Sequence, residues 1–317
     1  MKSVVTIGGG TGSFVLLSGL KKYPLDISAI VSMTDDGGST GVLRDELGVL
    51  PPGDVRKCLA ALAQASPEVR DLFNYRFTNG KLEGHNAGNL FLSALEKVTG
   101  SFIEAVEVAG KILNVYGKVI PVTREDVRLV VELNNGVSLQ GENKLDDNEE
   151  VRENGVRGIS FNHEVEANED ALDAISKTDF VVIGPGDIYG SIIPNLLVNG
   201  IPEALKNTKA KIVVIANITN KKGLTDGFTA QDFAKFIEGY LLGRSVDVVI
   251  YNTQEPKEEL ISKYEEQEGE DTIVEVERDN DRLVIGKDLL VDEEKHFIRH
   301  DSDKLSSAVV EYMKDNE

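Results

Sequence analysis

Glycines near the N-terminus form the strongest candidate for a ligand-binding site in this sequence. The apolar run Val4–Ile7 leads into Gly8-Gly9-Gly10-Thr11-Gly12-Ser13, which precedes a predicted helix at Phe14–Leu20. Glycines permit a tight turn and let backbone N–H groups, assisted here by two hydroxyls, approach a phosphate closely. The dinucleotide pattern G-x-G-x-x-G is met at Gly8 and Gly10 but not at Ser13, and no P-loop lysine follows. We predict a phosphate-binding turn, with a glycine-rich turn that binds nothing as the alternative.

A second candidate follows the next apolar run, Ile27–Val31. Its polar and small residues are Thr34, Asp35, Asp36, Gly37 and Ser39. In a doubly wound sheet this turn lies at the carboxyl edge, beside the first one. A carboxylate there can accept hydrogen bonds from a ribose or sugar hydroxyl, and two adjacent carboxylates can hold Mg²⁺ together with phosphate oxygens. The alternative is an Asp-Gly turn whose acids are solvated.

Another strand–glycine turn–helix unit begins after the apolar run Phe180–Ile183. Its turn contains Gly184 and Gly186 and runs on to Ser191. Two such turns at the carboxyl edge of one sheet would form two walls of a single crevice. A plain loop is the alternative.

Isolated polar residues complete the set of candidates. Asn86 and Asn89 open the predicted helix Leu90–Val98, where their amides can bind a ligand and Asn86 can cap the helix. Arg299 is suited to bidentate contact with a phosphate, and Tyr264, in a predicted helix, can stack on a base or bond a sugar. From local sequence alone, residues such as Arg299 and Tyr264 are usually surface features. No nucleophile elbow, zinc-protease motif or serine–histidine–acid arrangement is recognisable, so the catalytic residues are unknown.

The elements that must position these residues alternate between strands and helices. Continuous apolar runs, typical of strands buried on both faces, occur at Val4–Ile7, Ile27–Val31, Phe180–Ile183, Ile212–Ala216 and Val246–Tyr251. Stripes of apolar residues at helical spacing lie between them. The alternation predicts a Rossmann-like, doubly wound α/β fold with a mostly parallel sheet, in a single domain over 1–317.

One stretch interrupts this alternation and predicts a small β-rich insertion at about 118–165. Its expected strands are Lys118–Val122, Val127–Leu133, Val137–Gln140 and Arg157–Phe161, and Asn135-Gly136 predicts a hairpin turn. Between the last two strands, Glu142–Gly155 is acidic and poor in apolar residues, so we expect a solvated loop.

Composition limits the classes of partner. The formal net charge is −20, and no basic run exceeds two residues, which argues against nucleic acid and anionic membranes as partners. An anionic small ligand remains compatible, because local backbone N–H groups can hold it. The single cysteine, Cys58, is expected to be a buried structural thiol. With no signal peptide or apolar run long enough to span a bilayer, we expect a cytoplasmic protein.

An ordered set of motifs resembles one known family. The motifs that carry the resemblance are Ile7–Gly12, Thr34–Gly41, Pro51–Arg56, Gly88–Phe91, Ile183–Gly186 with Pro194–Leu197, and Arg299–Asp301. Together they resemble the gluconeogenesis factor family, also called YvcK-type or CofD-like, and they cover nearly the whole chain. The resemblance implies a Rossmann-like fold related to 2-phospho-L-lactate transferase.

The resemblance also implies a function. It implies binding of UDP-sugars, notably UDP-N-acetylglucosamine and UDP-glucose, by a regulatory protein needed for cell shape and envelope synthesis during gluconeogenic growth. It places Tyr264 and Arg299 among the contacts to the nucleotide sugar. No firm catalytic activity comes with this branch, and a regulatory protein partner and a homo-oligomer are compatible with it. Two segments, Asn217–Gly227 and Asn86-Ala87, depart from the usual family pattern, so ligand specificity can differ here.

Two other functions compete with a UDP-sugar-binding regulator. The first is a transferase related to 2-phospho-L-lactate transferase, which would move a phospho-acid group from a nucleoside-diphosphate-activated donor and use Asp35 and Asp36 to hold Mg²⁺. The second, an NAD-dependent dehydrogenase, is disfavoured by Ser13 and by the late position of Asp35 after its strand. The sequence does not identify a cofactor with certainty, and Mg²⁺ is expected only for the transferase.

Overall fold

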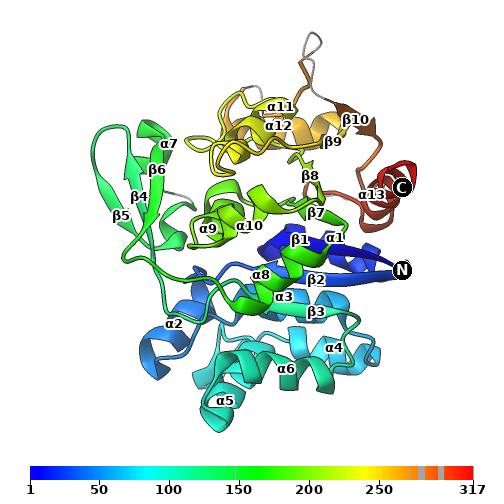
Figure 1. The fold of residues 1–317 in the computed structure, drawn as a ribbon. Helices are drawn as coiled ribbons and strands as arrows, with labels where there is room; N and C mark the ends of the chain where they lie inside the picture. The colour runs from blue at the N-terminus through cyan, green and yellow to red at the C-terminus, as the bar shows by residue number, and fades with distance from the viewer. Residues whose placement is uncertain (147, 271, 278–282, 292–295, 317) are drawn as a thin grey trace.

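A seven-stranded parallel sheet forms the centre of the molecule (Figure 1). The computed structural model describes residues 1–146, 148–270, 272–277, 283–291 and 296–316. The strands run in the order β10-β9-β8-β7-β1-β2-β3, and every neighbouring pair is parallel. Their bounds are β1 Lys2–Gly8, β2 Leu25–Val31, β3 Lys118–Pro121, β7 Phe180–Ile183, β8 Lys211–Ile215, β9 Val248–Asn252 and β10 Val284–Lys287.

The five strands expected from apolar runs are confirmed in the sheet. In β7 all four residues are buried, and in β8 only the first residue is exposed. Such strands read as continuous apolar runs because helices cover both faces. Strand β10 was not expected; as an edge strand its residues are half-buried or exposed, so it lacks that signal.

The order of the strands creates a switch point between β1 and β7. From β1 the chain builds outward to β2 and β3, then returns to place β7 on the other side of β1 and continues to β8, β9 and β10. In open α/β sheets, ligands bind at the carboxyl edge where the strand order reverses in this way. The two glycine turns predicted from the sequence follow β1 and β7, the two strands at this point.

Helices cover both faces of the sheet. On one face α1 (Gly10–Leu20) packs against α3 (Gly53–Leu62) and α13 (Ser302–Asp315), while α8 (Glu169–Lys177) and α10 (Ile201–Asn207) pack together on the other (Figure 1). The other helices are α2 Gly38–Leu47, α4 Pro67–Asn74, α5 Ala87–Thr99, α6 Phe102–Ile112, α7 Glu149–Asn154, α9 Ile193–Leu196, α11 Ala230–Glu238 and α12 Glu258–Glu268, with single turns η1 Gly80–Leu82, η2 Glu142–Lys144 and η3 Ile188–Ile192.

The β-insertion is a separate three-stranded antiparallel sheet in the order β5-β4-β6. Its strands are β4 Leu129–Leu133, β5 Ser138–Gln140 and β6 Val156–Phe161. The predicted Asn135-Gly136 turn joins β4 to β5, and Gly136 has a φ of +87°.

Two expectations for this region need correction. The run Lys118–Val122 was assigned to the insertion, but Lys118–Pro121 pairs with β2 as the edge strand of the main sheet, so the small sheet begins only at Leu129. The stretch 142–155, of which residue 147 lies outside the described residues, contains η2 and α7. It packs through Leu145 and Val151, which are only 3% and 1% exposed. Polar contacts also hold this acidic segment, since Asn143 donates to Asp36 and Arg152 forms an ion pair with Glu268.

We predict that replacing Gly12 with alanine destabilises the fold. A Cβ at this position would overlap the carbonyl oxygen of Pro185, where the turns after β1 and β7 touch. Backbone atoms cannot yield as a flexible side chain can, so we expect a loss of about 2–3 kcal/mol in the free energy of unfolding, measured by urea denaturation. Gly158→Ala is the control, because nothing lies within 4 Å of its added Cβ. Equal stability of the two variants would contradict the close approach of the turns.

Candidate ligand-binding site

The turn after β1 fits against the turn after β7 with no room for side chains. Gly12 lies against Pro185, and a Cβ at Gly9 would overlap the carboxylate of Asp54. Gly10 has a φ of +68°, a region that favours glycine. The hydroxyl of Ser13 lies 2.8 Å from where a Cβ on Gly8 would be, so Ser13 fills the space that the strand's last glycine leaves open. Gly8, Gly9 and Gly12 therefore serve close packing, while Gly10 and Gly12 at the start of α1 remain half-buried.

Three helices begin at this carboxyl edge without a side-chain cap. They are α1, α2 and α3, and their N-cap residues are Gly9, Gly37 and Pro52. Contacts bring their first turns together, because Gly9 lies against Asp54 and Gly53 lies against Asp35. Free N–H groups and the positive end of the helix dipole make such N-termini suitable for anions. The site is therefore locally favourable to a phosphate in a strongly acidic protein.

Asp35 and Asp54 lie close together within this group of helix starts. Asp35 accepts hydrogen bonds from the Thr40 hydroxyl at 2.8 Å and from the backbone N–H of Gly37 at 3.1 Å. Burial, and then the charge of Asp54, raise the pKa of Asp35 to about 6. Lys57 lies 3.0 Å from Asp54. Burial alone would lower the pKa of Lys57, but Asp54 and Asp35 raise it, so this lysine remains charged.

Asp36 points to a different part of the molecule. Its Oδ1 accepts a hydrogen bond from the backbone N–H of Asn143 at 2.8 Å, and its Oδ2 lies 3.9 Å from Arg128, both in the β-insertion. Asp35 and Asp36 are therefore not placed to hold one cation together, as the sequence had suggested. The carboxylate that lies near Asp35 is that of Asp54. Adjacent residues in an extended turn face opposite ways, which separates the two acids.

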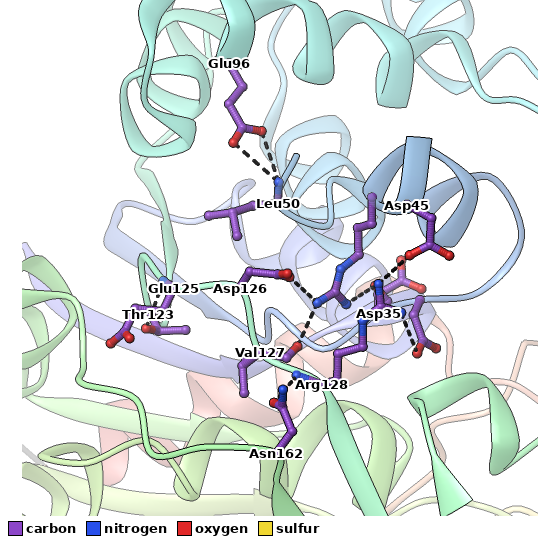
Figure 2. A network of polar contacts seen from close by, with 12 residues as sticks. Asp35, Asp45, Leu50, Glu96, Thr123, Glu125, Asp126, Val127, Arg128 and Asn162 are labelled. Atoms are coloured by element: carbon purple, nitrogen blue, oxygen red, sulfur yellow. Dashed lines mark hydrogen bonds and ion pairs between the residues drawn. The ribbon is translucent and has the colours of Figure 1, made fainter. Parts of the chain in front are cut away.

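The buried Arg44 links the insertion to the turn after β2, which carries Asp35 and Asp36. It donates to the carbonyl oxygens of Asp35 at 3.2 Å and Val127 at 2.8 Å and forms an ion pair with Asp126. Figure 2 labels these three partners. Figure 2 also shows Arg128 beside Asp45, with which it forms a second ion pair. These contacts link the turn after β2 to the chain that enters β4. The insertion is thus held at a fixed position beside the candidate site.

Other predicted site residues form a buried polar network behind the crevice. Asn86 caps α5 by accepting from the N–H groups of Gly88 and Asn89. Asn89 accepts from Arg56 at 3.0 Å and donates to Ser39 at 3.4 Å. These side chains already have partners, so they support the site's shape from behind.

Thr34 joins two turns of the site. Its hydroxyl lies 2.8 Å from that of Ser32 and donates to the carbonyl oxygen of Gly190 at 3.3 Å. It therefore connects the turn after β2 to the turn after β7, and its hydroxyl faces protein groups.

Two small cavities continue the crevice from the glycine turns toward the C-terminal part of the chain. One, of about 210 Å³, is lined by residues that include Thr11, Gly12, Gly186 and Arg299. The other, of about 230 Å³, is lined by residues that include Asp187, Lys221 and Tyr264. Asn217 and Thr219 line both cavities, and the Asn217 side chain is hydrogen-bonded to both backbone groups of Gly186. The two cavities therefore meet at one shared wall beside Gly186.

Tyr264 and Arg299 lie on either side of this wall and are linked through Ile298. The backbone N–H of Ile298 donates to the Tyr264 hydroxyl at 3.2 Å, and the ring packs on a small apolar cluster formed by Ile218, Leu260, Leu290 and Ile298. Arg299 is exposed, and its guanidinium lies 4.3 Å from the centre of the Phe297 ring. Tyr264 thus helps to place the segment that carries Arg299 at the cavity.

Further features of the described residues concern metal ligands, the cysteine, membrane-spanning helices and a second cavity. Within the described ranges, no group of three or more His, Cys, Asp or Glu residues is arranged to hold a metal ion. Cys58 is fully buried, and burial raises the pKa of its thiol, as expected of a structural cysteine. None of the described helices combines the length and apolar character that crossing a bilayer needs. A larger cavity, of about 740 Å³, is lined partly by residues at the amino ends of β1 and β2, away from the glycine turns.

Several polar residues of the site were not predicted from the sequence. Asp54 and Lys57 are in the first turns of α3, and the only signal was the Pro51-Pro52-Gly53-Asp54 helix start. Glu142 was assigned to a solvated loop, and Lys221 to a segment that departs from the family pattern. Their importance comes from contacts with residues far away in the chain.

Comparisons with known proteins identify the family of this chain and agree with its fold. A family model described as 2-phospho-L-lactate transferase CofD matches residues 4–290. The chain is 38% identical over 314 residues to the gluconeogenesis factor of Bacillus subtilis, covering 98% of each chain. It is 39% identical over 313 residues to the gluconeogenesis factor of Halalkalibacterium halodurans, covering 98% of this chain and 96% of that protein. A crystal structure of a UPF0052 family protein from Bacillus halodurans matches with a TM-score of 0.90 at 36% identity, covering 98% of this chain and 100% of that one.

We predict that Asp35→Asn stabilises the protein above the pKa of Asp35. A pKa raised in the folded state means that ionisation opposes folding, so stability is lost as pH rises through about 6. Removing this charge should increase the free energy of unfolding by about 1 kcal/mol at about pH 8, and the gain should vanish at about pH 4. Urea denaturation at both pH values measures it, with Asp71→Asn on the exposed surface of α4 as the control. A gain that is the same at both pH values would show that the carboxylate charge is not its cause.

Proposed function

The chain belongs to the CofD family, and from this premise we propose that it binds a nucleotide sugar, UDP-N-acetylglucosamine or UDP-glucose, at the carboxyl edge of its sheet. The observation that carries the proposal is the meeting of two glycine turns at the switch point, next to three helix N-termini without side-chain caps. Backbone N–H groups at such a position suit a diphosphate.

The proposed ligand follows the line of the crevice. Its diphosphate lies on the N-terminus of α1, between the turns Gly8–Ser13 and Gly184–Ser191. The two cavities that share Asn217 and Thr219 receive the groups on either side of the diphosphate. Arg299 neutralises phosphate charge from the exposed side, and Tyr264 borders the second cavity, where its ring can contact a base or sugar.

The proposed role is that of a sensor. Bound UDP-sugar stabilises one conformation of the crevice and the β-insertion above it, and a protein partner recognises that conformation. In this proposal the protein acts in the cytoplasm and supports cell shape and envelope synthesis during gluconeogenic growth. The link to gluconeogenic growth is supported by two proteins named gluconeogenesis factor, which are similar to this chain over nearly their whole length.

A transferase is the second candidate, and the pair Asp35 and Asp54 favours it. The charge of Asp54 contributes to the raised pKa of Asp35, which means that the two carboxylates repel each other. A divalent cation would relieve this repulsion, and oxygen ligands beside a phosphate site suit Mg²⁺. When bound, Mg²⁺ would neutralise charge on an activated donor. Asp35 and Asp54 would hold it, and the α1 N-terminus would orient the diphosphate.

Titration calorimetry tests the binding proposal. We expect selective, micromolar binding of UDP-N-acetylglucosamine, with NAD and a guanosine diphosphate ligand as controls. Arg299→Ala should weaken binding by about tenfold or more, because a charge-assisted contact to phosphate is lost. Arg157→Ala, which removes an exposed arginine of β6, is the matched control and should bind normally. Gly10→Asp should abolish binding, since it adds a negative side chain at the α1 N-terminus. Unchanged affinity in Arg299→Ala and Gly10→Asp would rule out this pose.

Product analysis separates the sensor from the transferase. The protein is incubated with activated donors, Mg²⁺ and candidate acceptors, and nucleotide products are quantified. A sensor leaves the UDP-sugar intact. Metal-dependent release of a nucleoside monophosphate that Asp54→Asn abolishes would establish the transferase instead.

A further inference from the structure

Glu142 occupies a position that the packing of its neighbours fixes. It begins η2, directly after β5 of the insertion, and follows Gly141, whose φ is +114°. The N–H of Gly141 donates to the Leu129 carbonyl oxygen at 2.8 Å, and the N–H of Asn143 donates to Asp36 at 2.8 Å. A Cβ on Gly141 would lie 2.6 Å from Asp36 Oδ2. Asp36 therefore binds Asn143, the residue after Glu142, and lies beside Gly141, the residue before it.

The Glu142 side chain crosses from the insertion to the wall of the crevice. Its Oε1 lies 2.6 Å, and its Cγ 3.3 Å, from where a Cβ on Gly190 would be. Gly190 belongs to η3, in the turn that follows β7, and its carbonyl oxygen accepts from Thr34. Only a glycine at this position leaves room for the carboxyl group. Glu142 thus reaches from the insertion to the Gly184–Ser191 turn.

The surroundings of the Glu142 carboxyl are acidic. The acids that face it are Asp35 after β2, Asp54 on α3, Asp187 after β7 and Asp146 in the insertion. The lysines nearby already have partners: Lys57 pairs with Asp54, and Lys221 pairs with Asp146 and Asp187. Among the residues that the structure describes, none forms a hydrogen bond or an ion pair with the Glu142 carboxyl. Burial, followed by these charges, raises the pKa of Glu142 to about 9, so the group is a neutral acid near pH 7.

We propose that Glu142 is a ligand-binding residue that donates a hydrogen bond from its carboxyl group to a phosphate oxygen of the nucleotide sugar, and that Asp36 positions it. This inference rests on the proposed function. A neutral acid can donate to an anionic oxygen, whereas a carboxylate in the same place would repel it. Ligand binding therefore favours the protonated form, and affinity falls when the proton is lost.

The test is calorimetry with UDP-glucose across the range from about pH 7 to about pH 10. Wild-type affinity should fall by up to about tenfold per pH unit above the pKa of Glu142. Glu142→Gln keeps a donor without an ionisable proton, so it should bind like the wild type near pH 7 and lose this dependence. Glu142→Ala should bind about tenfold more weakly near pH 7. The uracil ring also ionises in this range, so each pH is judged by the ratio of wild-type to Glu142→Gln affinity.

The controls separate position from general structure. Glu149→Gln changes an exposed acid of α7 and should behave like the wild type at every pH. Asp36→Ala should weaken binding and flatten the pH profile, and Asp36→Asn, which keeps an acceptor for Asn143, should restore both. A wild-type protein that binds no UDP-sugar overturns the proposed function and this inference together. Binding with the same affinity and pH profile in wild type, Glu142→Gln and Glu142→Ala overturns the role of Glu142 alone.

Discussion

The close approach of the two glycine turns at the centre of the sheet is the constraint on which the site depends. Gly12 lies so close to the Pro185 carbonyl that no side chain fits, and Gly9 lies equally close to Asp54. This packing requires β1 and β7 to be neighbours, which the reversal of strand order provides. It also leaves the first turn of α1 without a side-chain cap. The fold thus brings uncapped backbone N–H groups to its switch point, where we propose that the phosphates of the ligand bind.

Helix N-termini and lysines offset part of the acidic charge around this site, in a chain whose formal charge is −20. Three helix N-termini and Lys57 face Asp35 and Asp54, and Lys221 faces Asp187. Burial keeps Glu142 neutral near pH 7, which removes one charge from the crevice. The ion pairs and hydrogen bonds of Arg44, Arg128 and Asp36 hold the insertion in place beside these groups. The negative net charge of the protein is compatible with the proposed anionic ligand, because distant charges are screened and nearby groups dominate.

The sequence predicted what is encoded locally. Apolar runs identified β1, β2, β7, β8 and β9, and the Asn135-Gly136 turn and the Asn86 cap were confirmed. Lys118–Pro121 was misassigned because a short apolar run does not reveal which sheet it joins. Asp54, Lys57 and Glu142 were not selected because their environment comes from residues distant in the chain. The partner of Asp35 was expected beside it in sequence but lies on α3, since neighbouring side chains in an extended turn diverge.

A crystal structure of the protein with UDP-N-acetylglucosamine tests the central claim most directly. We expect electron density for the diphosphate at the N-terminus of α1, between Gly8–Ser13 and Gly184–Ser191, within reach of Arg299 and Glu142. The sugar and the base would extend along the cavities that share Asn217 and Thr219. Density for the nucleotide in the larger cavity, beside the amino ends of β1 and β2, with the glycine turns left empty, would contradict it.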